Sequence, residues 1–183
     1  MDFALPADVE ATRARIERFV NERIIPVESD RASFDEHDNI EAGLLERLHA
    51  EAKAQGLWAL QVPKAFGGGG LPVVAMAACY ETMNASIFGP VVFNSAAPDD
   101  GNMILLAKVA TDAQRARWLA PIVAGKVRSA FAMTEPHPGS GSDPSMMLTT
   151  ATREGDSWRI RGRKWFITGA TLVVDGGHTL AWL

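Results

Sequence analysis

The chain has 183 residues, of which 47% are hydrophobic and 22% charged, a balance typical of a soluble globular protein of one domain or one and a half. The net charge of −4 gives no general reason to expect binding to nucleic acid or an anionic membrane, and no apolar run approaches the roughly 20 residues that span a bilayer. With Cys79 as the single cysteine and an N-terminus that has neither a basic region nor a signal core, we expect a cytoplasmic protein without an internal disulfide.

Amphipathic helices are predicted for the first half of the chain. Apolar residues recur at helical spacing from residue 7 to residue 25, and Pro26 is expected to end that helix. A second helix is predicted from residue 41 to Gly56, a glycine at the position that helix C-termini prefer. Residues 72–86 are apolar almost all round, which predicts a buried helix.

Two further helices complete the predicted helical domain. One covers residues 98–110. The next begins with the capping-box pattern Thr111-Asp-Ala-Gln114 and ends at Gly125, with Pro121 expected to bend it.

The residue pattern changes near Lys126, where β-branched and aromatic runs begin to alternate with turn residues. Candidate strands are 127–133, 148–152, 157–160 and 164–168, with a hairpin turn at 154–156. The predicted fold class is therefore α+β: an all-helical domain over residues 1–126, then the first strands of a β-barrel or sandwich domain over residues 127–183.

Two other kinds of site are disfavoured. The four histidines form no spaced set with cysteine or carboxylates, so no metal site is expected. The glycine run Gly67–Gly70 lacks the Gly-Lys-Ser/Thr sequence of a phosphate loop, and a flexible connector is the favoured interpretation.

The chemistry is carried by two segments, Phe131-Ala-Met-Thr-Glu-Pro-His-Pro-Gly-Ser-Gly-Ser-Asp143 and Gly162-Arg-Lys-Trp-Phe-Ile-Thr-Gly169. Glycines let a backbone approach a ligand closely, and hydroxyl and N–H groups can hold phosphate oxygens. The two segments resemble the flavin-contacting segments of the acyl-CoA dehydrogenase family, T-E-P-G-A-G-S-D and K-x-W-I-T. The resemblance extends over roughly residues 1–170 and includes Pro63–Leu71, which is similar to the family's P-K-x-F-G-G-x-G-L stretch.

This resemblance implies a helical N-terminal domain, a β middle domain and a C-terminal four-helix bundle. It also implies FAD as cofactor and removal of hydrogens from Cα and Cβ of an acyl-CoA thioester, as in fatty acid metabolism. The implied partners are the acyl-CoA substrate and an electron-transfer acceptor, and the complete protein would be a homo-oligomer.

The site roles implied by the resemblance are specific. Phe131, Met133 and Thr134 would lie along the isoalloxazine ring of FAD. Gly141 and Ser142 would meet the FAD phosphates, and Ser142 would also meet the thioester-bearing arm of the substrate. The apolar wall against the flavin would be formed by Phe166, Ile167 and Thr168, with the Thr168 hydroxyl near the flavin N5.

The sequence departs from the family pattern inside these segments. His137-Pro138 adds two residues to the first segment, which changes the placement of Ser142. Phe166 replaces the usual tryptophan, and Trp165 beside it offers a second ring for the flavin. Glu135 and Lys164 are expected to pair between neighbouring strands as structural charges, with no catalytic role.

The last residues, 171–183, resemble the final strand of short-chain dehydrogenases, so a chimera or frame-altered remnant is favoured over an unusual strand in a simple fragment. The glutamate base of the family is expected in the C-terminal bundle, which the chain lacks, so no catalytic residue is assigned within it. We therefore expect little dehydrogenase activity from the truncated chain and weak FAD binding at best. The alternatives are a non-catalytic helical interaction module or an inert gene remnant.

Overall fold

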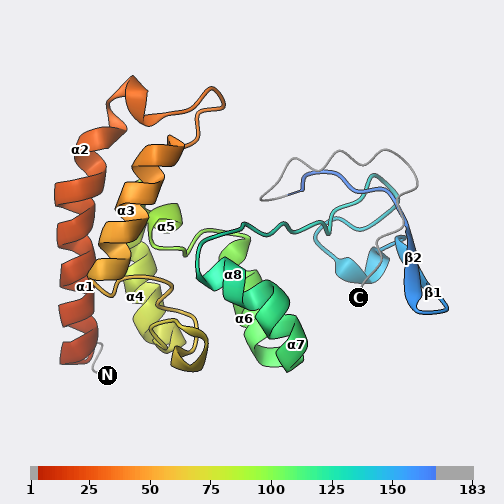
Figure 1. Ribbon diagram of the computed structural model, residues 1–183. Helices are drawn as coiled ribbons and strands as arrows, with labels where there is room; N and C mark the ends of the chain where they lie inside the picture. Colours follow the sequence, from red (N-terminus) through yellow and green to blue (C-terminus); the bar gives the residue numbers. More distant parts are fainter. Residues whose placement is uncertain (1–3, 168–183) are drawn as a thin grey trace. The chain divides into compact units, whose positions relative to one another are not determined.

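The computed structural model describes residues 4–167 of the chain, so Thr168 and the atypical tail 171–183 lie outside the described residues. The chain divides into two compact units between Val127 and Arg128. The first unit is helical and the second contains a two-stranded antiparallel sheet (Figure 1). This order of a helical part followed by a β part confirms the predicted fold class.

The first helical segment continues through its proline. It consists of α1 (Ala7–Phe19), a π-type turn η1 (Val20–Ile24) and α2 (Ile25–Glu28). The Ile25 N–H donates to the Val20 carbonyl five residues earlier, rather than four. Because this wider turn displaces the carbonyls that a proline ring would otherwise meet, Pro26 fits inside the helix. The prediction that Pro26 ends the helix is therefore wrong.

The last helical segment also has a π-type turn before its proline. It consists of α7 (Asp112–Gln114), the π-type turn η4 (Arg115–Leu119) and α8 (Ala120–Val123). The Ala120 N–H donates to the Arg115 carbonyl, again five residues earlier, and Pro121 follows directly. The capping box is confirmed, because Gln114 N–H donates to Thr111 Oγ1 at 3.3 Å and Thr111 N–H donates to Gln114 Oε1 at 2.9 Å.

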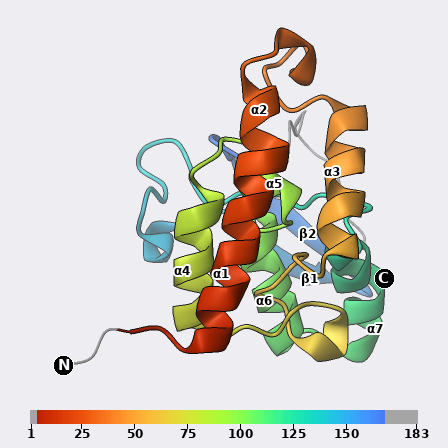
Figure 2. The same cartoon turned by 90° about the vertical axis from the view of Figure 1, so that its left-hand side faces the viewer.

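The other elements of the first unit lie between these two segments. They are η2 (Arg31–Ser33), α3 (Ala42–Ala54), η3 (Lys64–Phe66), α4 (Val73–Met83), α5 (Gly89–Val92) and α6 (Asp99–Val109), of which η2 and η3 are 3₁₀ turns. The Glu41 carboxylate caps α3 by accepting from the N–H groups of Gly43 and Leu44, both at 2.7 Å. Helix α1 packs against α4 (Figure 2).

The glycine run after η3 is packed rather than loose. The N–H groups of Gly69 and Gly70 donate to the carbonyls of Ala59 and Val62, and Leu71 N–H donates to the Leu60 carbonyl. These bonds tie the run to residues 59–62, so the interpretation as a flexible connector is wrong. The residues that hold the run in place, 59–62, precede it in the sequence, so the run's own composition does not reveal them.

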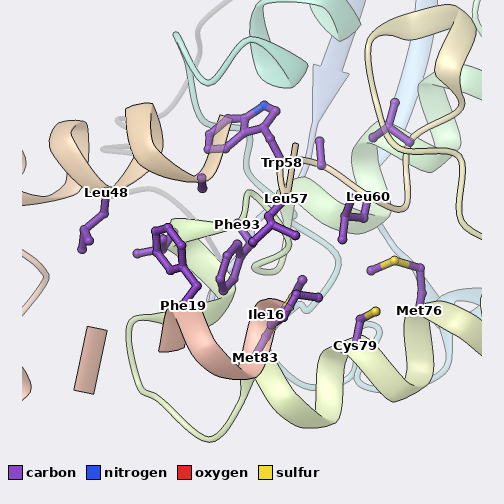
Figure 3. Close-up of a cluster of buried hydrophobic side chains, with 14 of the residues drawn as sticks. Ile16, Phe19, Leu48, Leu57, Trp58, Leu60, Met76, Cys79, Met83 and Phe93 are labelled. Carbon is purple, nitrogen blue, oxygen red and sulfur yellow. The ribbon is translucent and has the colours of Figure 1, made fainter. Parts of the chain in front are cut away.

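The apolar core of the described residues lies in the first unit (Figure 3). The rings of Phe19 and Phe93 meet edge to face at its centre, with 5.3 Å between their centroids. Helix α4 contributes Ala75, Met76, Cys79 and Met83, but its first residues are exposed, Val73 at 85% and Val74 at 70%. The prediction that this helix is buried all round is therefore wrong, because only one of its faces is packed. Within residues 4–167, no helix combines the length and the apolar character needed to cross a membrane.

The sheet of the second unit is a hairpin of β1 (Thr150–Glu154) and β2 (Ser157–Arg161), in a register that pairs Thr150 with Arg161. Its turn lies at Gly155-Asp156, inside the predicted turn. The predicted strand 127–133 is not regular, and neither are residues 164–167 of the predicted strand 164–168. The second unit also contains the 3₁₀ turn η5 (Pro144–Met146).

Candidate functional site

A buried carboxylate organises the loop that follows Thr134. The Glu135 side chain is 3% exposed, and both of its oxygens accept hydrogen bonds. Oε1 accepts from the N–H and the hydroxyl of Thr149 and from Lys164 Nζ, the last at 2.9 Å. Oε2 accepts from the N–H of Leu148 at 2.7 Å and, more weakly, from the N–H of Ser140 at 3.3 Å. We call these residues, Glu135, Ser140, Leu148, Thr149 and Lys164, the Glu135 cluster.

Charge and hydrogen bonds stabilise the ionised form of this carboxyl. The pKa of Glu135 is lowered far below its usual value, first by the Thr149 hydroxyl, then by the Leu148 N–H and the Lys164 ammonium. The ion pair with Lys164, whose side chain is 15% exposed, confirms the expected structural pairing. It does not join two strands, because residues 134–135 and 164–165 are irregular.

The cluster brings the two motif segments together. Lys164 Nζ also donates to the Met133 carbonyl at 2.9 Å, and the Trp165 N–H donates to the Thr134 carbonyl at 3.2 Å. Ser140 is fully buried, and its hydroxyl donates to the same Met133 carbonyl at 2.8 Å. Segments that lie about 30 residues apart in the sequence are thereby neighbours in the structure.

The two additional residues of the first segment form a turn outside this arrangement. Gly139 N–H donates to the Pro136 carbonyl at 2.8 Å, across the cis peptide His137–Pro138. The base of the turn is closed because Glu135 N–H donates to the Ser140 carbonyl at 2.7 Å. Residues 136–139 therefore absorb the insertion. Residues 136–138 also line a pocket of about 210 Å³, together with Glu135, Leu148, Gly162 and Arg163.

Two glycines allow the close packing around the carboxylate. A Cβ at position 139 would lie 2.5 Å from Glu135 Oε2, and one at position 162 would lie 1.9 Å from Thr149 Oγ1. Among residues 4–167, no atom beyond the chain neighbours of Gly141 lies within 4 Å of a Cβ placed there, so the space beside this residue is open. Gly139 and Gly162 thus serve packing, whereas the backbone at Gly141 is accessible to a ligand.

Most of the predicted cofactor-binding residues lie on the surface of the second unit. Phe131 is 49% exposed and Phe166 is 78% exposed, while Met133, Thr134 and Ile167 are half-buried. Gly141 and Ser142 are exposed on the loop after Ser140. The Trp165 and Phe166 rings contact each other, with 4.9 Å between centroids, and Phe166 has a φ of +49°. Thr168 lies outside the described residues.

Sequence reasoning missed three members of the Glu135 cluster, Ser140, Leu148 and Thr149. They contact the carboxylate only because the chain folds back on itself, and nothing in their local sequence indicates this. A buried carboxylate needs hydrogen-bond donors, so burial of Glu135 implies that such donors exist. The sequence does not indicate which residues supply them.

The sequence matches two profiles of the acyl-CoA dehydrogenase family: the N-terminal domain over residues 6–126 and the middle domain over residues 130–175. It is 38% identical over 175 residues to the probable acyl-CoA dehydrogenase FadE2 of Mycobacterium tuberculosis, covering 93% of this chain and 42% of that protein. The chain thus spans less than half the length of this curated relative.

Solved structures show the same likeness. A Mycobacterium abscessus protein assigned as an acyl-CoA dehydrogenase superimposes with a TM-score of 0.79 at 40% identity, covering 91% of this chain and 43% of that one. An acyl-CoA dehydrogenase of Bacillus anthracis, solved in complex with FAD, gives a TM-score of 0.64 at 26% identity, covering 89% of this chain and 27% of that one.

Proposed function

Because the chain belongs to the acyl-CoA dehydrogenase family, we propose that its second unit forms part of an FAD site, for the α,β-dehydrogenation of an acyl-CoA thioester. The observation that carries the proposal is the pairing of the two motif segments, in which the Trp165 N–H donates to the Thr134 carbonyl. This bond brings the residues before Glu135 beside those after Lys164.

The surface of these segments fits a flavin. The exposed rings of Phe131 and Phe166 offer the apolar contact that a planar aromatic group needs. The open space beside Gly141 and the exposed hydroxyl of Ser142 suit the phosphates, which are bound by backbone N–H and hydroxyl groups. The roles of Met133, Thr134, Ile167 and Thr168 along the isoalloxazine ring belong to the same proposal.

When bound, FAD supplies a hydride acceptor, which none of the twenty side chains provides. The chain's own contribution would be to orient the cofactor, exclude water through Phe131 and Phe166, and hold the phosphates at Gly141 and Ser142. The acyl-CoA substrate, an electron-transfer acceptor and a homo-oligomeric assembly are proposed for the whole protein by its family. A cytoplasmic location stays a prediction from composition.

FAD titration tests the proposal directly. We expect the 183-residue chain to bind FAD weakly but saturably, seen as a change in flavin fluorescence. The variants Phe131→Ala and Phe166→Ala should each weaken binding about tenfold, since each removes a large aromatic contact. Trp158→Ala is the matched control, because Trp158 is an aromatic residue of the same unit, 43% exposed, on β2 and outside both segments.

Substrate turnover is a separate measurement. Reduction of an artificial electron acceptor with a series of acyl-CoA thioesters reports whether the chain performs the proposed chemistry. FAD binding that is absent, or that is equally sensitive to Trp158→Ala, would contradict the proposed flavin site.

A further inference from the structure

We infer that Glu135 is a positioning residue for the flavin site: its carboxylate sets the two candidate flavin-binding segments, 131–134 and 164–167, against each other. The inference rests on the proposed function for its ligand. It assigns to Glu135 no contact with substrate or cofactor, because both of its oxygens are occupied by donors of the chain itself.

The first step concerns what holds the described part of the second unit together. Among the described residues of the second unit, 128–167, the buried ones are Glu135 and Ser140, and both are polar. The apolar side chains of this range are exposed or half-buried. An apolar core therefore does not fix the described part of this unit, and the polar contacts of the Glu135 cluster take that role.

The second step is the position of the cluster between the two segments. Glu135 directly follows Thr134, and its partner Lys164 lies two residues before Phe166. Lys164 Nζ bridges Glu135 Oε1 and the Met133 carbonyl, both at 2.9 Å. The position of Phe166 relative to Met133 and Thr134 thus depends on the charge that holds Lys164 in place.

The third step is the chemistry that the cluster requires. Each carboxylate oxygen faces at least two donors, and an ionised carboxylate accepts at both oxygens without donating. A glutamine would direct its NH₂ group at one of these donor sets whichever way it is turned. Glu135→Gln therefore keeps the volume of the side chain but leaves at least one N–H group of the cluster without an acceptor.

The experiment compares Glu135→Gln with Glu154→Gln in the full 183-residue chain. Glu154 is the matched control, because it is a carboxylate of the same unit whose ion pair with Arg159, at 2.8 Å, is exposed. The first readout is the exchange rate of the Trp165 amide hydrogen, measured by NMR, since this group donates across the two segments. We expect Glu135→Gln to accelerate this exchange about tenfold, and Glu154→Gln to leave it at the wild-type rate.

The second readout is the dissociation constant of FAD together with the visible absorption spectrum of the bound flavin. Glu135→Gln should weaken binding about tenfold and change the shape of the absorption band, because the aromatic contacts lose their fixed position. A purely local structural role would not alter the spectrum of a ligand that Glu135 does not touch.

Two further variants keep the inference falsifiable if Glu135→Gln fails to fold. Lys164→Met removes the bridging cation but keeps the carboxylate and its N–H donors, and should still accelerate exchange at Trp165. The exchanged pair Glu135→Lys with Lys164→Glu should not restore the wild-type rate, because a lysine at 135 cannot accept from Leu148 and Thr149.

The outcomes separate this inference from the proposed function. Wild-type exchange at Trp165 in folded Glu135→Gln and Lys164→Met, or full restoration by the exchanged pair, would overturn the inference. Unchanged FAD affinity and spectrum in Glu135→Gln would also overturn it. If the wild-type chain does not bind FAD, the proposed function is contradicted, while the exchange rates still decide whether Glu135 sets the two segments against each other.

Discussion

The indole N–H of Trp58 donates to the Val123 carbonyl at 2.7 Å and joins the chain after α3 to the last turn of α8. Lys53 completes the contact from α3, since its ammonium lies 4.2 Å from the Trp58 ring centroid and donates to the Ala124 carbonyl at 2.8 Å. Two helix ends that are about 70 residues apart in sequence are therefore held by one buried ring.

Removing the indole N–H tests this contact. Trp58→Phe should lower the free energy of unfolding of the helical unit by about 1.5 kcal/mol, because a buried carbonyl loses its strongest donor while a 3.4 Å contact from Asn94 Nδ2 remains. Chemical denaturation followed by circular dichroism measures the change. The same substitution at the exposed Trp158 should leave this transition unaltered.

Gly125 is favoured by its local backbone conformation and, in addition, by the same ring. Its φ is +71°, and a Cβ there would lie 2.7 Å from a Trp58 ring carbon. Gly125→Ala should therefore cost about 2 kcal/mol or more, from the left-handed backbone and the steric clash together. Gly56→Ala isolates the backbone contribution and should cost about 1 kcal/mol, since Gly56 has a φ of +63° and, in the described part of the chain, a Cβ there would meet nothing within 4 Å beyond its chain neighbours. Equal losses in the two variants would show that the ring makes no difference.

The capping box of α7 makes a local and measurable contribution. Thr111→Ala should destabilise the helical unit by about 1 kcal/mol, because the Gln114 N–H loses its acceptor. Thr12→Ala serves as the comparison, since the Thr12 hydroxyl donates to the Asp8 carbonyl within α1 and caps no helix end. Thermal unfolding of both variants would reveal a shift confined to Thr111→Ala.

Gly162 packs against Thr149, whereas Gly141 lies beside open space. Alanine substitutions at these two glycines should therefore differ in their effect on the stability of the second unit. Gly162→Ala should destabilise this unit by about 2 kcal/mol, because the new Cβ overlaps the Thr149 side chain. Gly141→Ala should change stability by less than about 0.5 kcal/mol, since the space beside it is open. Under the proposed function, Gly141→Ala should instead weaken FAD binding. Native-state hydrogen exchange within β1 and β2 measures the stability of both variants.

Lowering the pH should destabilise the second unit, because Glu135 becomes protonated. The folded pKa of this carboxyl is lowered, so its stabilising effect is fully present above the usual glutamate pKa and is lost as the pH falls through that value toward the folded pKa. Amide exchange at Leu148 and Thr149, corrected for the intrinsic pH dependence, should therefore lose protection with acid. In Glu135→Gln the same residues should show no such acid dependence, and a persisting one would point to another group.

Features fixed by neighbouring residues could be predicted from the sequence. The capping box at Thr111 and the glycines that follow α3 and α8 are decided within one helical turn, and the structure confirms them. Pro26 was mispredicted because its tolerance depends on an extra residue in the preceding turn, which leaves no compositional signal.

The candidate site shows the same limit. Its two segments could be recognised from their residues, but the contacts between them could not, because Leu148 and Thr149 reach Glu135 only through a closed loop. The strand expected at 127–133 is not regular either, and Val127 is the single β-branched residue of this segment, so its local strand preference is weak. The flavin contacts of the individual site residues stay predictions.

The π-type turns before Pro26 and Pro121 act as phase shifts in the helical repeat. Each adds one residue, so every side chain beyond it is rotated by about 100° relative to an uninterrupted α-helix. Deleting one residue from either turn would restore the ordinary repeat, but would turn the following residues to a different side and bring the proline ring against a carbonyl. Length in these two turns is therefore constrained more tightly than residue identity, and we expect single-residue deletions there to be tolerated less well than substitutions.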